Sequence, residues 1–378
     1  AMESTSRSGS PLFVMRGHRE AVNCVGFTSI GNKRCIVSGS GDGEVRIWDL
    51  SSRRPIVATH AHGSSVLQAT SMCNGTRMLT QAKDGKVSLW DVSTLSQNPI
   101  GGENREKSPK PLHTFGTNAY GFCRMGVLES DGRQLVVTAS PLQSRLLLWD
   151  LKSPKPIHSI TLTPNSDAKT GSKSTFSSNL SKALNLGMCT HASLFVPPPL
   201  DPKFSKKSPE NSEKTPGKLT ENSPVVSWAT ESGHVGFYSV RAGSSLAVGY
   251  LEKQPLMCAN VVPKPFGGLG IAGSANGHLV AFSGDFKKGQ VVSHKTVKVS
   301  DKGLAEVHVR EDSKIFLTAG WDHRIRVFST KSLKLLAILK YHTESAFCAN
   351  FSSAEDGLIA SGSKDKSIAI FRVYQSRR

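Results

Sequence analysis

Long apolar runs are missing from this sequence of 378 residues. No stretch of eighteen or more apolar residues occurs, so we expect no membrane-spanning helix. The first ten residues, AMESTSRSGS, lack the apolar core of a secretory signal. The seven cysteines form no CxxC pair and no disulfide framework. These absences favour a protein of a reducing compartment, in the nucleus and cytoplasm, with no membrane association.

Motifs of catalysis and cofactor binding are also missing. The sequence contains no GxxxxGK[ST], HExxH or GxSxG. Cysteine and histidine do not cluster at the short spacing that a metal site needs. Five cysteines recur instead at one offset in a repeated unit, which fits the packing of a small buried side chain: Cys24, Cys123, Cys189, Cys258 and Cys348. We therefore expect no enzyme activity, no metal and no cofactor.

The charge is strongly basic, with 47 Lys and Arg against 29 Asp and Glu and a formal net charge of +18. Such a balance can serve nucleic acid or an acidic protein partner. The basic residues are scattered, however, and the densest stretch, Lys287 to Lys302, is flanked by Asp285 and Asp301. This scatter favours a basic surface over specific nucleic-acid binding.

A repeat is the strongest positive signal. Three segments end in a Trp-Asp pair, at Trp48, Trp90 and Trp149, and each consists of a short apolar strand, a polar turn and an alternating strand. Four later segments keep the pattern with another aromatic residue: Tyr238, Phe282, Phe328 and Phe371. Successive anchors are 42, 59, 89, 44, 46 and 43 residues apart. Four of these six spacings match the roughly 40–45 residues of one four-stranded propeller blade.

The two long spacings contain polar insertions, which we place at about 96–110, 163–185 and 197–223. They are rich in Ser, Pro, Gly and Lys and cannot bury enough apolar surface to fold alone. The last repeat stops at Tyr374, after its third strand, while a surplus strand, Leu12 to Met15, precedes the first repeat. Pairing the two removes both exposed edges. We predict an all-β, seven-bladed propeller over 11–374 closed by the N-terminal strand, with a flexible segment 1–10 and a tail 375–378.

Three repeats share a His–Ser/Thr–Asp–aromatic set at constant spacing. The sets are His18, Ser38, Asp42 and Trp48; His62, Thr80, Asp84 and Trp90; and His342, Ser361, Asp365 and Phe371. Each resembles a catalytic triad, but an active site has no reason to be copied around a repeat. We predict a structural hydrogen-bond chain instead, in which Asp accepts from His, His meets the hydroxyl, and the hydroxyl accepts from the indole N–H. Phe371 has no N–H to donate.

These motifs resemble the WD-repeat family. Two segments, TAGWDHRIRVFSTKSLKLLAIL (Thr318–Leu339) and SGSKDKSIAIFRVY (Ser361–Tyr374), are similar to the G-protein-β-like protein 1 family, also called ASTRA-associated protein 1. The resemblance implies a non-enzymatic scaffold or adaptor that joins the TTT co-chaperone assembly in the maturation of phosphatidylinositol-3-kinase-like kinases. Its implied partners are TTT subunits and those kinases, bound by a monomeric propeller within a larger complex.

Two other functions stay open. Substrate receptors of cullin–RING ubiquitin ligases end a blade's third strand in W-D-x-R/K, and the segment from Trp149 to Lys152 fits loosely. The segment from Trp321 to Arg324 fits the letters but lies in a turn. A ribosome- or RNA-linked scaffold would use the positive charge and would release RNA as salt rises.

A partner surface is expected on the turns between the second and third strands of the blades. The residue before the acidic position of these turns is, in chain order, Gly41, Lys83, Leu142, Glu231, Ala275, Trp321 and Lys364. Trp321 stands beside His323 and Arg324, a composition typical of an interface anchor, although an indole folded onto its own turn is the alternative. Arg324, Lys364 and Lys366 would add a positive rim for an acidic partner, and Lys83 is a further candidate for partner binding.

Overall fold

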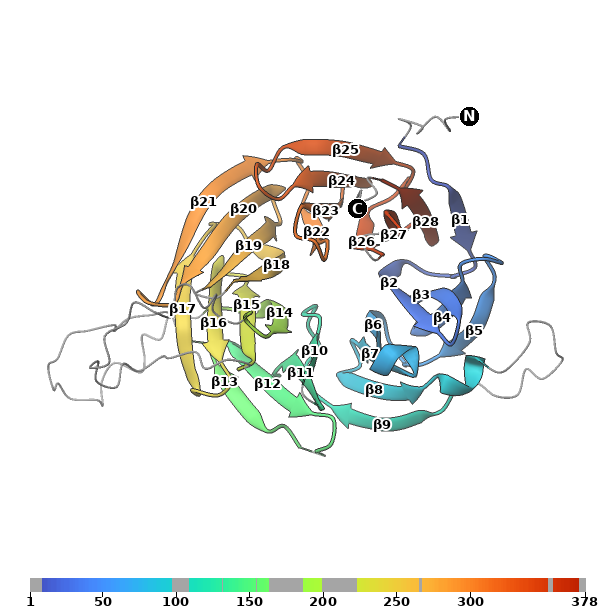
Figure 1. Cartoon of the computed structure of the whole chain (residues 1–378), viewed down its shortest axis with the longest axis horizontal. Helices are drawn as coiled ribbons and strands as arrows, with labels where there is room; N and C mark the ends of the chain where they lie inside the picture. Colours follow the sequence, from blue (N-terminus) through green and yellow to red (C-terminus); the bar gives the residue numbers. More distant parts are fainter. Residues whose placement is uncertain are drawn as a thin grey trace, which may run out of the picture. The chain divides into compact units, whose positions relative to one another are not determined.

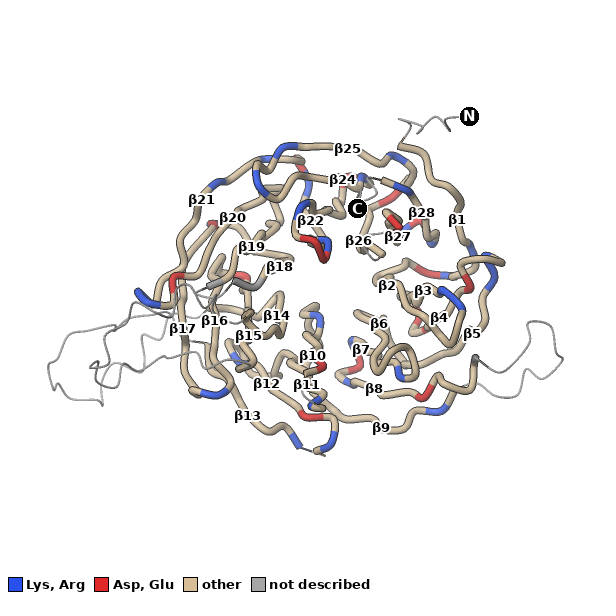
Figure 2. Tube along the Cα trace, in the orientation of Figure 1, with Lys and Arg blue, Asp and Glu red and all other residues tan. Residues whose placement is uncertain are grey.

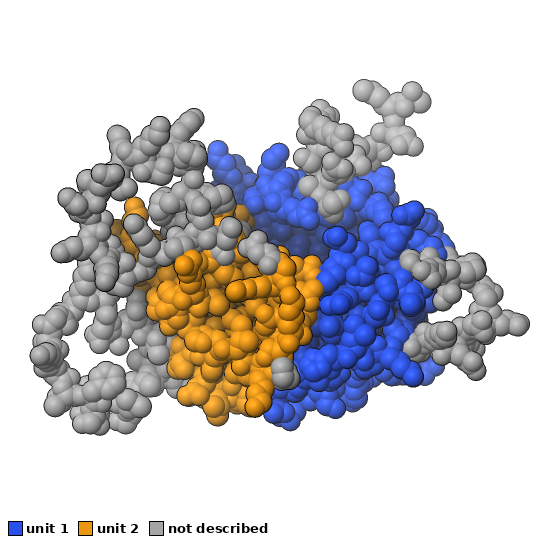
Figure 3. Space-filling model, turned by 60° about the horizontal axis from the view of Figure 1, so that its bottom comes forward, with its two compact units in different colours: residues 1–120, 300–378 blue, residues 121–299 orange. Residues whose placement is uncertain are grey.

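The computed structural model describes residues 9–96, 109–130, 132–153, 155–162, 186–198, 223–264, 267–352 and 356–373. The chain divides into two compact units, residues 1–120 with 300–378 and residues 121–299, which Figure 3 shows in blue and orange. No helix in the described residues is long and apolar enough to cross a membrane. The predicted insertions fall almost wholly outside the described ranges, so their bounds and those of the single propeller domain stay predictions.

The first unit contains four four-stranded antiparallel sheets, or blades (Figure 1). Blade 1 consists of β2 (Val22–Ile30), β3 (Lys33–Ser40), β4 (Glu44–Asp49) and β5 (Pro55–His60). Blade 2 consists of β6 (Val66–Met72), β7 (Arg77–Ala82), β8 (Lys86–Asp91) and β9 (Pro111–Gly116). Blade 6 consists of β22 (Leu304–Val309), β23 (Ile315–Gly320), β24 (Arg324–Ser329) and β25 (Leu335–Lys340). Blade 7 consists of β26 (Ala346–Phe351), β27 (Leu358–Ser363), β28 (Ser367–Arg372) and β1 (Phe13–Arg16).

The second unit contains three blades. Blade 3 consists of β10 (Gly126–Ser130), β11 (Arg133–Ala139), β12 (Arg145–Asp150) and β13 (His158–Thr161). Blade 4 consists of β14 (Cys189–Phe195), β15 (Val225–Thr230), β16 (His234–Ser239) and β17 (Ser244–Tyr250). Blade 5 consists of β18 (Leu256–Lys264), β19 (Gly267–Ser274), β20 (His278–Asp285) and β21 (Gln290–Lys298). A single parallel pair, Val248 with Gln290, joins the outer strands of blades 4 and 5.

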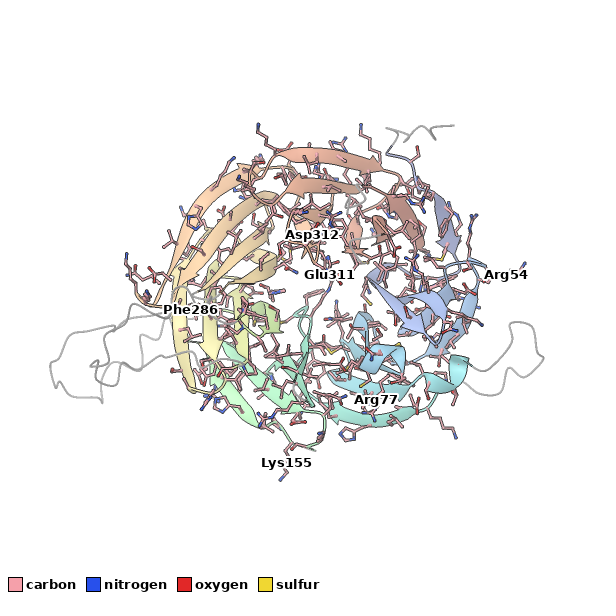
Figure 4. The ribbon with its side chains drawn as sticks, in the orientation of Figure 1. Arg54, Arg77, Lys155, Phe286, Glu311 and Asp312 are labelled. Carbon is pink, nitrogen blue, oxygen red and sulfur yellow. The ribbon has the colours of Figure 1, made fainter. Side chains whose placement is uncertain are left out.

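The seven blades confirm the predicted all-β fold, and the sequence pattern explains them. The second and third strands of each blade are mostly buried on both faces, since successive residues point to opposite faces of the sheet and most of them are shielded from solvent. Trp48 and Phe371, two of the anchors that set the repeat, are almost fully buried. Outer strands such as β21 are largely exposed and carry more polar residues. In the second unit Phe286 (labelled in Figure 4) packs edge-on against Phe237, with ring centroids 5.3 Å apart.

The N-terminal strand completes the last blade, as predicted. β1 pairs antiparallel with β28 from Phe13 with Ile370 to Arg16 with Ser367, and Leu12 N donates to Ile370 O at 2.6 Å. Figure 1 shows β1 along the outer side of β28. The first and last segments of the chain therefore share one sheet, which covers the edge that β28 would otherwise expose.

Basic residues are spread over the blades of both units and do not form one stripe (Figure 2). The densest basic stretch of the sequence coincides with the outer strand β21, where side chains face solvent. Among the described residues, the charge distribution therefore gives no sign of a continuous nucleic-acid track within either unit.

Candidate functional site

Blade 2 contains a complete chain of hydrogen bonds from a turn carboxylate to a core indole. His62 Nδ1 lies 3.1 Å from Asp84 Oδ2, and His62 Nε2 lies 2.8 Å from Thr80 Oγ1. Trp90 Nε1 donates to the same Thr80 oxygen at 2.8 Å. A carboxylate only accepts, so Nδ1 carries the imidazole proton and the Thr80 hydroxyl donates to Nε2. Every polar group in the chain thereby has a partner.

Blade 1 corrects one prediction, because Asp42 is not the acceptor of His18. His18 Nδ1 lies 3.2 Å from Glu44 Oε2, while His18 Nε2 and Trp48 Nε1 meet Ser38 Oγ at 2.7 and 2.8 Å. Asp42 Oδ1 is occupied within its own turn, where it accepts from Ser40 Oγ and from Glu44 N. The longer Glu44 side chain, at the start of β4, reaches the imidazole instead.

Arg46 explains how the buried carboxylate of Glu44 is stabilised. Arg46 donates to both carboxylate oxygens, at 2.8 and 2.9 Å, and its guanidinium lies 5.5 Å from the centre of the Trp48 ring. A glutamate two residues after Asp42, followed by an arginine two residues later, was the sequence signal for this variant of the motif.

Blade 7 has the same arrangement without the indole. His342 Nδ1 lies 2.9 Å from Asp365 Oδ2 and His342 Nε2 lies 2.7 Å from Ser361 Oγ. Asp365 also accepts from the backbone and hydroxyl of Ser367 at 3.0 and 2.6 Å. The Phe371 ring occupies the place of the indole and is buried. In blade 3 the reverse holds: Trp149 Nε1 donates to Thr138 Oγ1 at 2.9 Å.

The hydroxyls of these triad-like sets are unsuited to nucleophilic attack. Ser38, Thr80 and Ser361 are 0% exposed, so no substrate carbonyl can reach them. In blades 1 and 2 the oxygen is also engaged by an indole N–H. The geometry supports a structural role for the histidine and hydroxyl of all three sets.

Burial decides the ionisation of the histidines. Desolvation, reinforced by the charge of Arg46, lowers the pKa of His18 to about 4 despite the opposing effect of Glu44. Desolvation also lowers the pKa of His62 against the pull of Asp84. Burial alone would raise the pKa of Asp365, but hydrogen bonds from His342 and Ser367 outweigh it and hold that pKa well below its usual range. His18 and His62 are therefore neutral at pH 7.

The residues predicted to bind a partner all lie in the first unit, at the turns that connect second and third strands. Trp321 and His323 lie between β23 and β24, Lys364 and Lys366 between β27 and β28, and Lys83 between β7 and β8. Arg324 begins β24. His323, Lys364 and Lys366 are exposed, whereas Trp321, Arg324 and Lys83 are half-buried.

Ser345 links the two turns of blades 6 and 7. Its hydroxyl donates to Trp321 O at 3.0 Å, and its carbonyl accepts from Lys364 N at 2.9 Å. Trp321 N donates to Gly303 O at 2.9 Å. Trp321 and Lys364 are thus held on neighbouring turns by hydrogen bonds to their backbone groups. We call Trp321, His323, Lys364 and Lys366 the blade 6–7 turn surface.

The positive rim is partly neutralised. Lys364 Nζ lies 3.9 Å from Glu344 Oε2, and Lys366 Nζ lies 3.9 Å from Glu20 Oε1, with all four side chains about half exposed. Such exposed pairs are weak and rearrange easily. The surface therefore presents mixed charge around the indole.

Two residues of the blade 6–7 turn surface occupy a strained backbone position that the sequence did not reveal. His323 and Lys366 have φ of 62° and 68°, while the equivalent residues of blades 1 and 2 are Gly43 and Gly85, with φ of 87° and 73°. Glycine adopts this left-handed conformation without a steric cost, and a residue with a Cβ does not. Strain of this kind gathers at functional positions.

Among the described residues, no group of three or more His, Cys, Asp or Glu side chains could hold a metal ion. All seven cysteines are thiols and none forms a disulfide. Six of them are buried. Two approach each other in the second unit, where Cys123 Sγ lies 3.8 Å from Cys189 Sγ.

Comparison with protein families matches the description "WD domain, G-beta repeat" at residues 9–49 and 333–372. The first range covers β1 to β4, and the second range runs from just before β25 to the end of β28. The match therefore falls on the strands of blade 7 and on blades 1 and 6, where two of the three histidine chains lie.

Relatives align over almost the whole chain. A mouse protein named "Guanine nucleotide-binding protein subunit beta-like protein 1" is 29% identical over 371 residues, covering 96% of each chain. A protein of Schizosaccharomyces japonicus named "ASTRA-associated protein 1" is 28% identical and covers 97% of this chain and 99% of its own. The protein of that name from Aspergillus flavus is 25% identical over 93% of this chain and 86% of its own.

Proposed function

We propose that this chain, a WD-repeat protein similar along nearly its whole length to G-protein-β-like protein 1 and ASTRA-associated protein 1, is a non-enzymatic scaffold of an ASTRA-type assembly. Within it the chain binds subunits of the TTT co-chaperone and supports the maturation of phosphatidylinositol-3-kinase-like kinases. It acts in the nucleus and cytoplasm, as one propeller inside a larger complex.

The observation that carries this proposal is the blade 6–7 turn surface. An indole, an exposed imidazole and two lysines gather on two linked turns, and two of these residues keep a strained backbone where blades 1 and 2 have glycine. Aromatic anchors surrounded by adaptable polar groups are typical of protein–protein interfaces. The buried hydrogen bonds of His342 with Asp365 and Ser361 hold the blade 7 turn in place, as a rigid scaffold requires.

Affinity purification followed by mass spectrometry tests the proposal, with the wild-type chain and Trp321→Ala compared in the same cells. We expect TTT subunits and large kinases of this class with the wild type, and at least about a 30-fold loss with Trp321→Ala, the scale of an interface hot spot. Leu112→Ala, at an exposed apolar residue of the first unit outside this surface, is the control and should retain every partner.

Other outcomes would replace the proposal. Recovery of a cullin–RING adaptor would assign the chain to ubiquitin ligases, and recovery of ribosomal proteins with RNA-dependent retention would favour an RNA-linked scaffold. Equal recovery of TTT subunits with Trp321→Ala would keep the scaffold and remove the blade 6–7 turn surface from its interface. In that case the half-buried indole has a packing role.

A further inference from the structure

A second surface lies in the other unit, at the corresponding ends of blades 3 and 4. Phe122, Leu142 and Met188 are 66%, 57% and 45% exposed, and exposed apolar side chains that gather in one patch mark interaction sites. Phe122 precedes β10, Leu142 lies in the turn between β11 and β12, and Met188 precedes β14. We call these three residues the blade 3–4 apolar patch.

The chain segments of Phe122 and Met188 lie side by side. Cys123 and Cys189, which follow them directly in the chain, bring their sulfur atoms within 3.8 Å. An isolated parallel bridge joins Arg124 to His191 just beyond. The segments that start at Phe122 and Met188 therefore run next to each other in the same direction.

Leu142 belongs to the same cluster because its turn is tied to the loop of Met188. Ser144 donates to Gly187 O from both its backbone N and its hydroxyl, each at 3.2 Å. Glu231 of blade 4 fixes the other side, since Met188 N donates to Glu231 Oε2 at 3.3 Å and Glu231 N donates to Met188 O at 3.1 Å. The patch is thus built on ordered backbone and not on a loose loop.

The composition around the patch identifies the kind of partner. The charged residues that chain order and hydrogen bonds place next to the patch are Arg124, half-buried, Arg145, exposed, and Glu231, whose carboxylate accepts from Met188 N. Aromatic residues, Met and Arg are enriched at the centre of protein interfaces, where Lys, Glu and Asp are depleted. Apolar area with an arginine rim complements an apolar anchor flanked by carboxylates. Two arginines are few for nucleic acid, which needs many phosphate contacts.

We propose that the blade 3–4 apolar patch binds an acidic peptide segment of a partner protein, which buries an aliphatic or aromatic anchor between Phe122, Leu142 and Met188. Arg145 contacts the carboxylates of that segment. This site goes beyond the proposed function and does not depend on it, because it concerns the second unit and is tested with the purified chain alone. A scaffold with two such surfaces can hold two partners at once.

The experiment selects peptides from a display library of random 12-residue sequences on the intact purified chain. The best binders are then measured by fluorescence anisotropy. We expect sequences with Leu, Phe or Trp next to Asp and Glu. Their binding should weaken at least about 10-fold with Phe122→Ser and with Leu142→Ser. Binding should also weaken with Arg145→Gln and with rising salt concentration, because both reduce the attraction between Arg145 and the peptide carboxylates. Ile157→Ser, at a similarly exposed apolar residue of blade 3, is the matched control and should bind as the wild type.

Three outcomes would overturn the proposal. Selected peptides could lack acidic residues or bind Phe122→Ser unchanged. A labelled 12-residue RNA could bind with a dependence on Phe122, through base stacking. Light scattering could show a dimer that Phe122→Ser dissociates, in which case the occupant is a second copy of this chain. Unchanged melting temperatures of Phe122→Ser and Leu142→Ser would show that their loss of binding is not a loss of folding.

Discussion

His18 Nδ1 lies 3.2 Å from Glu44 Oε2, so a glutamate at the start of a strand performs in blade 1 what an aspartate in the turn performs in blades 2 and 7. The substitution separates two roles. In blades 2 and 7 one aspartate both caps the turn and orients the histidine, whereas blade 1 gives the cap to Asp42 and the histidine to Glu44.

This separation predicts an order of stabilities. Asp84→Ala removes both roles and leaves His62 without its acceptor, so we expect a loss of roughly 1–3 kcal/mol in the free energy of unfolding. Glu44→Ala should cost about as much, because it leaves both His18 and Arg46 without a carboxylate. Asp42→Ala loses only the turn contacts and should cost about 1 kcal/mol. Urea unfolding of the three variants measures this order. A Glu44→Ala variant as stable as the wild type would contradict the assignment of Glu44 as the partner of His18.

The lowered pKa of His18 predicts a stability that falls with acid. Unfolded His18 takes up a proton near pH 6.5, but the folded chain resists protonation down to about pH 4. The contribution of neutral His18 to the free energy of unfolding is therefore fully present above pH 6.5. It declines as pH falls from 6.5 toward 4, by up to about 3 kcal/mol from this residue.

Urea unfolding at pH 7.5 and pH 5 measures that dependence. His18→Gln should be less stable than the wild type at pH 7.5, but it should lose about 2 kcal/mol less between the two pH values. The exposed His60→Gln is the control and should keep the wild-type dependence. Equal pH dependence in all three proteins would mean that His18 is protonated in the folded chain.

Completion of blade 7 by β1 predicts unequal effects of two nearby substitutions. Met15 is 2% exposed and packs with Ile368 and Ile370, so Met15→Ala should lower the free energy of unfolding by about 2–5 kcal/mol. Leu12, three residues earlier, is 50% exposed. Leu12→Ala should therefore change the free energy of unfolding by less than about 0.5 kcal/mol. Thermal unfolding measures both. Similar stability of the two variants would show that pairing with β28 does not depend on this packing.

Strain at His323 predicts opposite changes in stability and binding. His323→Gly relieves the left-handed backbone conformation and should raise the free energy of unfolding by up to about 1 kcal/mol. The same change removes an exposed imidazole from the blade 6–7 turn surface, so recovery of partners should fall. Gly85→Ala, at the equivalent turn of blade 2, should be destabilising because a Cβ there meets both a strained φ and the backbone of Asn118. A destabilised His323→Gly would refute the strain argument.

The sequence by itself determined the repeat, the all-β fold and the pairing of the first strand with the last. These depend on local alternation, turn chemistry and a period of about 43 residues, all of which act within one blade and can be read along the chain. It also identified the histidines and hydroxyls of three hydrogen-bond chains, since each set recurs at one spacing.

Only the tertiary structure decided which carboxylate meets His18, because Asp42 and Glu44 are two residues apart and side-chain reach separates them. The same holds for the strained φ of His323 and Lys366, which depends on a turn geometry that the rest of each blade imposes. The blade 3–4 apolar patch could not be predicted from the sequence either. Phe122, Leu142 and Met188 are far apart in sequence and ordinary in type, and they form a surface only because two inner strands run side by side and a turn is bonded to the loop between them.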